Sequence, residues 1–496
     1  MNQKITSLNR YTISSFITSF LCLTVIVGCS IPPPPKAFGP VPSARQLAWH
    51  QMKYYAFIHF GPNTFTNKEW GYGDEPESIF NPTELDCRQW ARVAKEAGME
   101  GIILTAKHHD GFCLWPTTTT THSVKNSPWK NGHGDVVAEL QAACKEYGLK
   151  MGIYLSPWDR NNGLYGTPEY IKIYRAQMKE LLSNYGDIFE FWFDGANGGD
   201  GYYGGARETR RIDNKTYYDW DNSYKIVREL QPMAVMFSDG GPDVRWIGNE
   251  RGYAGETNWC TVRKGAFYAG IGGVNDQLQS GHADGDTWLP AEVNTSIRPG
   301  WFYHPEQDSL VKTLPQLVDN WFHSVGMNGN FLLNVPPDKR GLFHEKDVKR
   351  LMEFKAYRDQ AFSTDLAKNA AISASSTRGG SSRYSAKNIL DEDTNNYWAT
   401  DDDVRTANVE LNWAMPTEVN AIMLREEVAL GQRVTGFTIE SKENDTWVSV
   451  AKGTTVGNRR MVSFETRTMT RLRIKLEARA SLVIASLAVY RTPDIK

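Results

Sequence analysis

Ionisable and aromatic side chains gather where five apolar runs of the sequence end. In chain order they are His59 after the first run; Lys107, His108, His109 and Asp110 after the second; Tyr154, Ser156 and Trp158 after the third; Asp194 after the fourth; and Asp239 and Asp243 after the fifth. A single histidine after a strand usually has a structural role, but five successive run ends of this kind indicate one shared site.

Carboxyl groups in such a site suit the hydrolysis of a glycosidic bond. In a retaining enzyme one carboxylate attacks the sugar, and a second carboxyl group about 5–5.5 Å away serves as acid and then as base. Asp194 is the leading nucleophile candidate, because an apolar run delivers it and Gly195 lets the chain turn away at once. A helix cap or a structural ion pair is the alternative role. Glu250, Glu256 and Glu292 compete for the second position.

The elements that must position these residues alternate between short apolar runs and amphipathic stretches. We expect strands at 54–60, 101–106, 150–155, 188–193 and 234–237, with helices between them at 87–96, 136–147, 168–185 and 224–230. Repeated strand–helix units imply a parallel sheet with helices outside, and a length of about 320 residues suits a (β/α)8-like barrel. In a barrel the carboxyl ends of the strands converge on one face. A doubly wound sheet is the alternative fold, but no glycine-rich nucleotide loop follows the first run.

Several segments resemble glycoside hydrolase family 29, the α-L-fucosidases. They are Ile58-His59-Phe60-Gly61, Asn67-Lys68-Glu69-Trp70-Gly71, Lys107-His108-His109-Asp110-Gly111-Phe112 and Trp192-Phe193-Asp194-Gly195. The resemblance spans roughly residues 46 to 362 in the expected order. Two further stretches, Gly241 to Trp246 and Ile297 to Phe302, look like the subfamily that cleaves α-1,3/1,4-linked fucose from branched glycans.

This resemblance implies a retaining, exo-acting α-L-fucosidase with Asp194 as nucleophile and no cofactor for catalysis. It places the acid/base in the loop where Glu250 stands, although the spacing of 250 − 194 = 56 residues is longer than expected. The glycine-rich segment 198–207 looks like an insertion that accounts for the difference. The implied fucose pocket consists of His59, Glu69, Trp70, His108, His109, Tyr154 and Trp192.

The chemistry of these residue types agrees with a neutral sugar. His, Glu and Tyr can donate to and accept from hydroxyl groups in fixed directions, and Trp70 or Trp192 can cover an apolar methyl group. His108 and His109 could instead suggest a metal. Adjacent strand residues point to opposite faces, so we favour sugar contacts and expect no metal in the active site.

The N-terminus reads as an export signal. Lys4 and Arg10 precede an apolar stretch from Ile13 to Val27, and Ile26-Val27-Gly28-Cys29 resembles a bacterial lipobox. We therefore expect a lipoprotein signal peptide at 1–29 and a proline-rich tether at 30–42, with a single membrane-spanning anchor as the alternative. The protein would then be exported from a bacterium and held by lipid at a periplasmic or outer surface.

The sequence changes character after the barrel region, which we place at 43–362. Residues 363–496 are rich in Thr, Ser and Val with short alternating runs, which predicts an all-β sandwich. The segment from Ala386 to Trp398 resembles the discoidin, or F5/8 type C, family, whose members bind carbohydrate or hold a structural Ca²⁺. Asp391 and Asp393 offer the oxygen ligands that Ca²⁺ accepts; a solvated acidic turn and a scaffold role for the domain are the alternatives.

Composition agrees with these expectations. Among 496 residues, Lys+Arg 55 nearly balances Asp+Glu 57, so the net charge of -2 offers no long-range attraction to nucleic acid. A fucosylated oligosaccharide is the expected partner. Two rival functions remain at this stage: a non-catalytic surface protein that binds glycans, and a glycosidase for another uncharged sugar.

Overall fold

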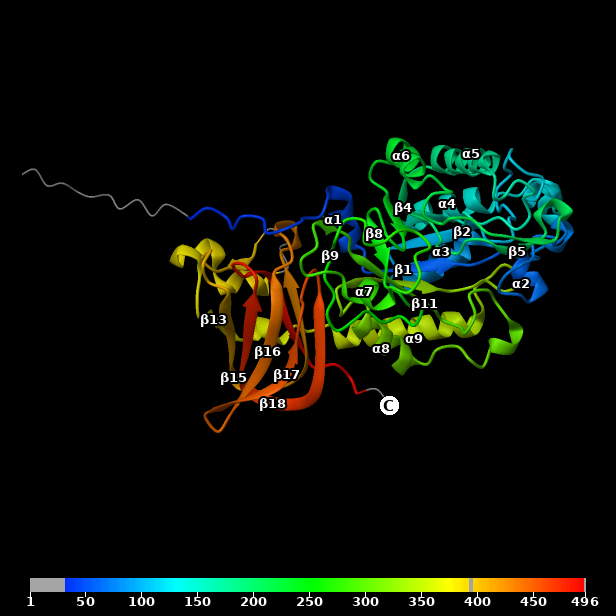
Figure 1. Cartoon of the computed structure of the whole chain (residues 1–496). Coiled ribbons are helices and arrows are strands. Elements are labelled where there is room, and N and C mark those ends of the chain that lie inside the picture. The colour runs from blue at the N-terminus through cyan, green and yellow to red at the C-terminus, as the bar shows by residue number, and fades with distance from the viewer. Residues whose placement is uncertain (1–31, 392–395, 495–496) are drawn as a thin grey trace, which may run out of the picture.

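A closed parallel barrel forms the first domain of the chain (Figure 1). The computed structural model describes residues 32–391 and 396–494. The barrel strands follow one another around the closed sheet in the order β1-β12-β11-β8-β7-β4-β3-β2. Their bounds are β1 Tyr54–Ile58, β2 Gly101–Lys107, β3 Lys150–Leu155, β4 Ile188–Trp192, β7 Val235–Ser238, β8 Val244–Trp246, β11 Ala291–Ser296 and β12 Gly329–Asn334. The (β/α)8-like barrel predicted from the sequence is therefore confirmed.

Helices surround the barrel and begin or end at local signals in the sequence. The principal helices are α3 Cys87–Glu96, α4 Val136–Tyr147, α5 Pro168–Asn184, α6 Trp220–Leu230, α8 Leu314–His323 and α9 Glu345–Ala361. The Asp135 side chain caps α4 by accepting from the Ala138 amide, and Gly148 ends that helix with a φ of 64°. Glycine adopts this left-handed conformation without the steric cost of a Cβ atom.

Short helices and strands lie before the first barrel strand and in the loops that connect the barrel elements. The short helices are α1 Ala44–Gln51, α2 Pro62–Thr66 and α7 Asn275–Ser280. The predicted insertion at 198–207 contains β5 Gly199–Gly201, which forms a hairpin with β6 Glu208–Arg210 directly after the segment. Strand β9 Thr261–Val262 pairs with β10 Thr287–Trp288.

The second domain is all-β, as the sequence predicts. Its strands are β13 Ala371–Ala374, β14 Trp398–Ala399, β15 Thr406–Glu426, β16 Val434–Glu443, β17 Thr446–Gly453, β18 Arg460–Ala478 and β19 Val483–Tyr490. They pair antiparallel around the long strands β15 and β18, and Trp398, Leu411, Leu472 and Ile484 are among the buried residues of a core separate from that of the barrel.

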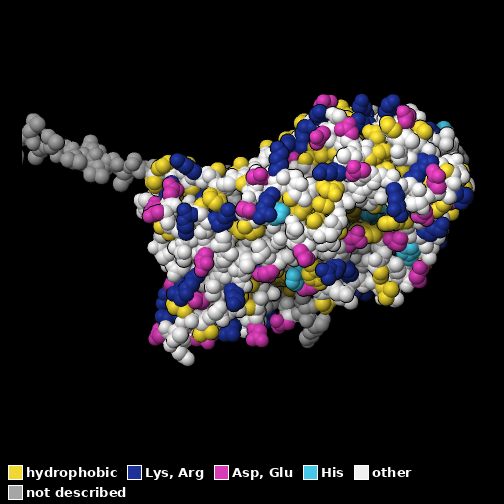
Figure 2. Space-filling model, in the orientation of Figure 1, with side chains coloured by type: hydrophobic (Ala, Val, Ile, Leu, Met, Phe, Trp, Pro, Cys, Tyr) yellow, Lys and Arg dark blue, Asp and Glu magenta, His cyan; other side chains and the backbone are white. Residues whose placement is uncertain are grey.

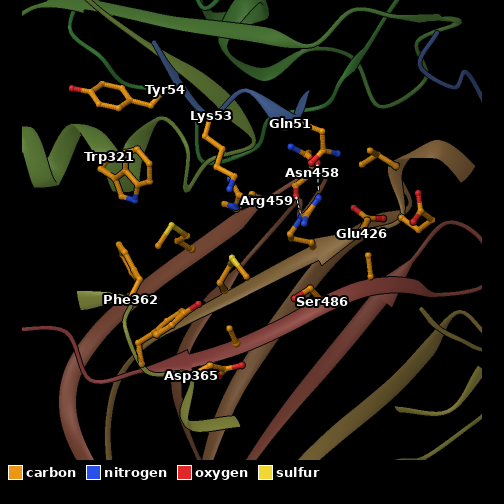
Figure 3. Close-up of a pocket in the computed structure, with 18 of the residues that line it drawn as sticks. Gln51, Lys53, Tyr54, Trp321, Phe362, Asp365, Glu426, Asn458, Arg459 and Ser486 are labelled. Carbon is orange, nitrogen blue, oxygen red and sulfur yellow. Dashed lines mark hydrogen bonds between the residues drawn. The ribbon is translucent and has the colours of Figure 1, made fainter. Parts of the chain in front are cut away.

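The two domains pack together at the end of the barrel where its strands begin (Figures 1 and 3). A cleft of about 990 Å³ opens there, between Lys53 and Tyr54 on the barrel and Asn458 and Arg459 on the β domain. The Asn458 side-chain Nδ2 donates to the His50 carbonyl at 2.9 Å, and the Asn458 backbone amide donates to Asn328 Oδ1 at 2.7 Å. Among the described residues, those that line the cavity at the opposite end of the barrel all come from the first domain.

On the face shown in Figure 2, basic and acidic side chains intersperse over both domains. Within residues 32–391 and 396–494, no helix has the length and apolar character that crossing a membrane requires. The predicted signal peptide and Cys29 lie outside the described residues, as does Asp393 of the Ca²⁺ prediction.

Candidate active site

A cavity of about 430 Å³ lies at the carboxyl ends of the barrel strands. Its lining residues are Phe57, His59, Trp70, His108, His109, Tyr154, Trp192, Asp194, Gly195, Ala196, Asp239, Trp246, Glu250, Gly270, Ile271, Asn294 and Trp301. Asp194, Glu250 and all residues of the implied fucose pocket except Glu69 are in this set.

Both oxygens of the Asp194 carboxylate are held in place. The Tyr154 hydroxyl donates to Oδ2 at 2.8 Å, and the Ala196 amide donates to Oδ1 at 2.6 Å. His109 Nε2 lies 4.0 Å from Oδ2. Because Asp194 follows β4 directly, the barrel fixes its backbone while these contacts fix the orientation of the carboxylate.

Three buried imidazoles form one side of the cavity. His59 Nδ1 lies 2.9 Å from Asn334 Oδ1, and His109 Nδ1 lies 2.7 Å from the Ser156 hydroxyl. Burial lowers the pKa of His59 to about 3 and that of His109 to about 4, and it lowers the pKa of His108 well below its usual value. The rings are therefore neutral near pH 7, and because Nδ1 of His59 and of His109 is already bonded within the protein, Nε2 is the nitrogen that each of these two rings offers to a hydroxyl group.

His108 and His109 lie on the same cavity, contrary to the argument that adjacent residues must point apart. Their ring centroids are only 4.1 Å from each other. The alternation rule does not apply because β2 ends at Lys107, so both histidines belong to the loop beyond the strand. Among the residues that the structure describes, no group of three or more His, Cys, Asp or Glu side chains is arranged to hold a metal ion.

Aromatic rings complete the floor and the mouth of the cavity. Trp192 stacks on Phe237 with centroids 3.9 Å apart and on Tyr154 at 5.3 Å. Trp70 stands edge-on to His109, and 52% of its surface is exposed. The Trp70 ring is therefore free to contact a sugar.

The three candidates for the second carboxyl group occupy different places. Glu250 lines the cavity, where Trp301 Nε1 donates to its Oε2 at 3.2 Å. Glu256 forms an ion pair with Arg460 of the β domain. Glu292 is fully buried inside the barrel, where it accepts from Trp192 Nε1 at 2.8 Å. Glu250 alone among the three therefore reaches the cavity that contains Asp194.

The surroundings of Glu250 favour its protonated form. Burial raises the pKa of this carboxyl group, the Trp301 hydrogen bond acts in the opposite direction, and the negative charges of Asp194 and Glu69 raise it further. A carboxyl group near an anionic carboxylate and away from bulk water is suited to donate a proton.

Glu69 contacts the wall of the site from outside the cavity lining. One carboxylate oxygen accepts from the Trp301 amide at 2.8 Å, and the other pairs with His304 Nε2. In this structure Glu69 fixes the loop that carries Trp301, which in turn lies 5.1 Å from the His59 ring between centroids.

Some of the residues at the strand ends point elsewhere. Lys107 reaches outward to Asp159, 3.3 Å away, and Asp243 pairs with Arg45 and Arg228. Conversely, the sequence did not assign Asn294 or Trp301 to the site, and Asp239 was noted without a role. The run of aromatic residues around Trp301 was the available signal for that residue, whereas nothing local distinguishes Asn294, which accepts from Trp246 Nε1 at 3.0 Å.

Comparison with known proteins agrees with this geometry. Residues 40–360 match the family model described as α-L-fucosidase, and residues 371–487 match that of the F5/8 type C domain. The chain is 44% identical over 463 residues to α-L-fucosidase 1 of Arabidopsis thaliana, covering 92% of this chain and 88% of that protein.

Solved structures give the same result for the whole molecule. A glycoside hydrolase family 29 member from an unknown rumen bacterium superimposes with a TM-score of 0.83 at 44% identity, over 93% of this chain and 79% of that one. A family 29 fucosidase of Ruminococcus gnavus in complex with fucose gives 0.85 at 31% identity, over 94% and 98%. The chain thus belongs to glycoside hydrolase family 29, the α-L-fucosidases, and carries a C-terminal F5/8 type C domain.

Proposed function

We propose that this α-L-fucosidase is a retaining, exo-acting enzyme that releases α-1,3/1,4-linked fucose from branched glycans. The observation that carries the proposal is that Asp194 and Glu250 share one cavity, close enough for the charge of Asp194 to raise the pKa of Glu250. A fucose residue would fit against the neutral imidazoles and the Trp192 ring, with its hydroxyl groups paired to fixed donors and acceptors.

In the first step, Asp194 acts as the nucleophile. Its carboxylate attacks the anomeric carbon while the bond to the leaving oxygen breaks, and Glu250 gives its proton to that oxygen. Tyr154 and the Ala196 amide hold the carboxylate in line for this attack. The product is a covalent fucosyl-enzyme and a free hydroxyl group on the remaining glycan.

In the second step, Glu250 acts as a base. Its carboxylate takes a proton from water as the water oxygen attacks the anomeric carbon, and the bond to Asp194 breaks. Two successive inversions release fucose with the configuration of the substrate.

Substitution of the nucleophile tests the mechanism. Asp194→Gly should retain the fold but lose turnover, because no covalent intermediate can form. Azide added to this variant should attack an activated aryl α-fucoside directly and give β-fucosyl azide, as judged by NMR of the product. Turnover of Asp194→Gly close to that of the unmodified enzyme would sink the assignment.

The linkage preference is supported by Trp246 and Trp301, which line the same cavity as Glu250 and come from the two stretches that look like the α-1,3/1,4 subfamily. Contacts with a neighbouring sugar would help to orient the scissile bond. We expect larger kcat/KM values for branched Lewis-type trisaccharides than for α-1,2-fucosides or aryl fucosides. Equal values would remove this part of the proposal, and no turnover of any fucoside would favour a glycan-binding role instead.

We also propose that the protein is exported and anchored through lipid on Cys29. The support is the lipobox-like Ile26-Val27-Gly28-Cys29. The predicted proline-rich tether is not a free spacer over its described part, because Arg378 Nε donates to the Pro33 carbonyl at 2.7 Å and the Phe38 amide donates to the Leu430 carbonyl at 3.0 Å. Cys29→Ala should release the enzyme from the membrane fraction in a bacterial host. Unchanged partitioning would indicate an uncleaved apolar anchor.

A further inference from the structure

A glycine-rich segment without regular secondary structure forms one part of the cavity wall. Residues 263–274 connect β9 to α7, and Gly270 and Ile271 line the cavity. Gly265, Gly270 and Gly273 have φ values of 73°, 78° and 76°. Glycine residues give the unfolded backbone more conformational freedom than other residues do, so ordering this segment costs more entropy. Contacts from other parts of the chain must therefore fix this wall.

Two side chains from other loops hold the backbone of Gly270. Asp239 Oδ2 accepts from the Gly270 amide at 2.6 Å, and Asn214 Nδ2 donates to the Gly270 carbonyl at 3.0 Å. Asp239 follows β7, while Asn214 precedes α6. Both backbone polar groups of Gly270 are thus hydrogen-bonded to loops that adjoin elements of the barrel.

Asp239 is also packed against the residue that follows the nucleophile. A Cβ atom placed on Gly195 would lie 2.0 Å from Asp239 Oδ2, so the carboxyl group fills the space beside Gly195. Only 9% of Asp239 is exposed, and the groups that act on its carboxyl group in the described part of the chain are the Gly270 amide and Asp194, neither of which is a cation.

The cost of burying this carboxyl group calls for an explanation. Burial raises the pKa of Asp239 to about 7; the Gly270 amide opposes that shift, and the charge of Asp194 adds to it. A buried, unpaired carboxyl group destabilises a fold unless it has a specific partner. Its partner here is the wall of the cavity.

The wall lies on the side of Asp194 away from the imidazoles. The histidines come from the ends of β1 and β2, whereas Asp239 and Gly270 come from loops after β7 and β9, and the barrel order places β4 between these groups. A fucose residue against the imidazoles would lie across the cavity from Gly270 and Ile271, which line it together with Glu250, the proposed proton donor to the leaving sugar.

We propose that Asp239 is a positioning residue that determines specificity for the sugar on the leaving-group side, by fixing the Gly270–Ile271 wall. This inference rests on the proposed fucosidase mechanism. It predicts that loss of the tether harms an oligosaccharide, whose second sugar packs on the wall, more than an aryl fucoside with a small leaving group.

The test compares kcat/KM for a branched fucosylated trisaccharide with kcat/KM for 4-nitrophenyl α-L-fucoside. In Asp239→Ala the ratio of the two constants should fall about tenfold, mostly through KM for the trisaccharide, whereas Asp239→Asn keeps an acceptor oxygen and should stay within about twofold of the unmodified ratio. Asn214→Ala should lower the ratio as well, although Asn214 does not line the cavity.

Gly272→Ala is the matched control on the same segment. A Cβ atom on Gly272 meets no heavy atom within 4 Å, so this variant should leave the ratio unchanged. An unchanged ratio in Asp239→Ala would overturn the inference, and a fall in Asp239→Ala without one in Asn214→Ala would show that the carboxyl group contacts the substrate instead of acting through the wall. If the unmodified enzyme cleaves neither substrate, the proposed function fails rather than this inference.

Discussion

In the proposed mechanism Glu250 changes its protonation state during each cycle, and its surroundings set the balance between the two states. Burial and the charge of Asp194 raise its pKa, whereas the hydrogen bond from Trp301 Nε1 lowers it by stabilising the ionised form. The first step needs the protonated carboxyl group, so cleavage that depends on proton donation is lost as pH rises through this raised pKa.

Removing the Trp301 hydrogen bond should therefore shift the pH profile in a defined direction. In Trp301→Phe the pKa of Glu250 should rise further, and the alkaline limb of kcat/KM for a trisaccharide should move to higher pH. Trp246→Phe is the control, because Trp246 bonds to Asn294 and not to Glu250. A limb that moves to lower pH in Trp301→Phe would contradict this account.

Truncating each of the three candidate carboxyl groups distinguishes the acid/base residue from residues with a structural role. Glu250→Ala should slow trisaccharide cleavage by about 10²–10⁴-fold, spare the first step for an activated aryl fucoside, and regain rate with azide to give α-fucosyl azide. Glu256→Ala and Glu292→Ala should show no azide rescue. If rescue appears in one of these and not in Glu250→Ala, the acid/base role moves to that residue.

At the scale of elements, the junction after β4 connects Asp194, the proposed nucleophile, to the glycine-rich wall of the cavity. Asp194 leaves the strand, Gly195 packs on Asp239, and Asn197 Nδ2 donates to the Gly195 carbonyl. The absence of a side chain at position 195 is therefore a packing requirement, in addition to allowing a turn.

Gly195→Ala should damage activity through this packing. The new methyl group would displace the Asp239 carboxyl group, so kcat/KM for a trisaccharide should fall at least tenfold, while circular dichroism shows a folded barrel. Gly61→Ala is the matched control after β1, since its Cβ atom meets nothing within 4 Å and its backbone is extended. Full activity in Gly195→Ala would show that the junction tolerates displacement of Asp239.

At the scale of the whole molecule, the β domain supports the barrel from the end opposite the active site. Asn458 and Arg459 face the start of β1 across the cleft (Figure 3), and Arg460 pairs with Glu256 of the barrel. The Glu256 side chain is 59% exposed, so buried amide contacts such as those of Asn458 contribute more to this interface than the ion pair does.

Asn458→Ala should lower the free energy of unfolding by about 1–3 kcal/mol, because the buried His50 carbonyl loses its donor. Thermal unfolding should report the change, while kcat/KM stays close to the unmodified value since Asn458 lies outside the active-site cavity. Asn412→Ala, on an exposed position of β15, is the control and should change stability by less than about 0.5 kcal/mol. Equal stability of the two variants would contradict the role given to this contact.

The regular elements of the barrel could be predicted from the sequence because they follow from local patterns. Helices α3 and α4 begin and end where helical spacing and caps indicate, and β3 has the bounds of its apolar run. Parallel strands place their carboxyl ends together, so the position of Asp194 after β4 was enough to bring it to the site. The motifs around His108 and Asp194 likewise carried the family resemblance without any structure.

The tertiary structure alone decided which loop residues meet. Glu250, Glu256 and Glu292 look alike in the sequence, yet one lines the cavity, one joins the β domain and one is buried beneath Trp192. The link from Asp239 to Gly270 spans 31 residues, and that from Glu69 to Trp301 spans 232. Periodicity reports the burial of a helix or strand, but the path of an irregular loop depends on contacts between distant residues, which no local pattern encodes.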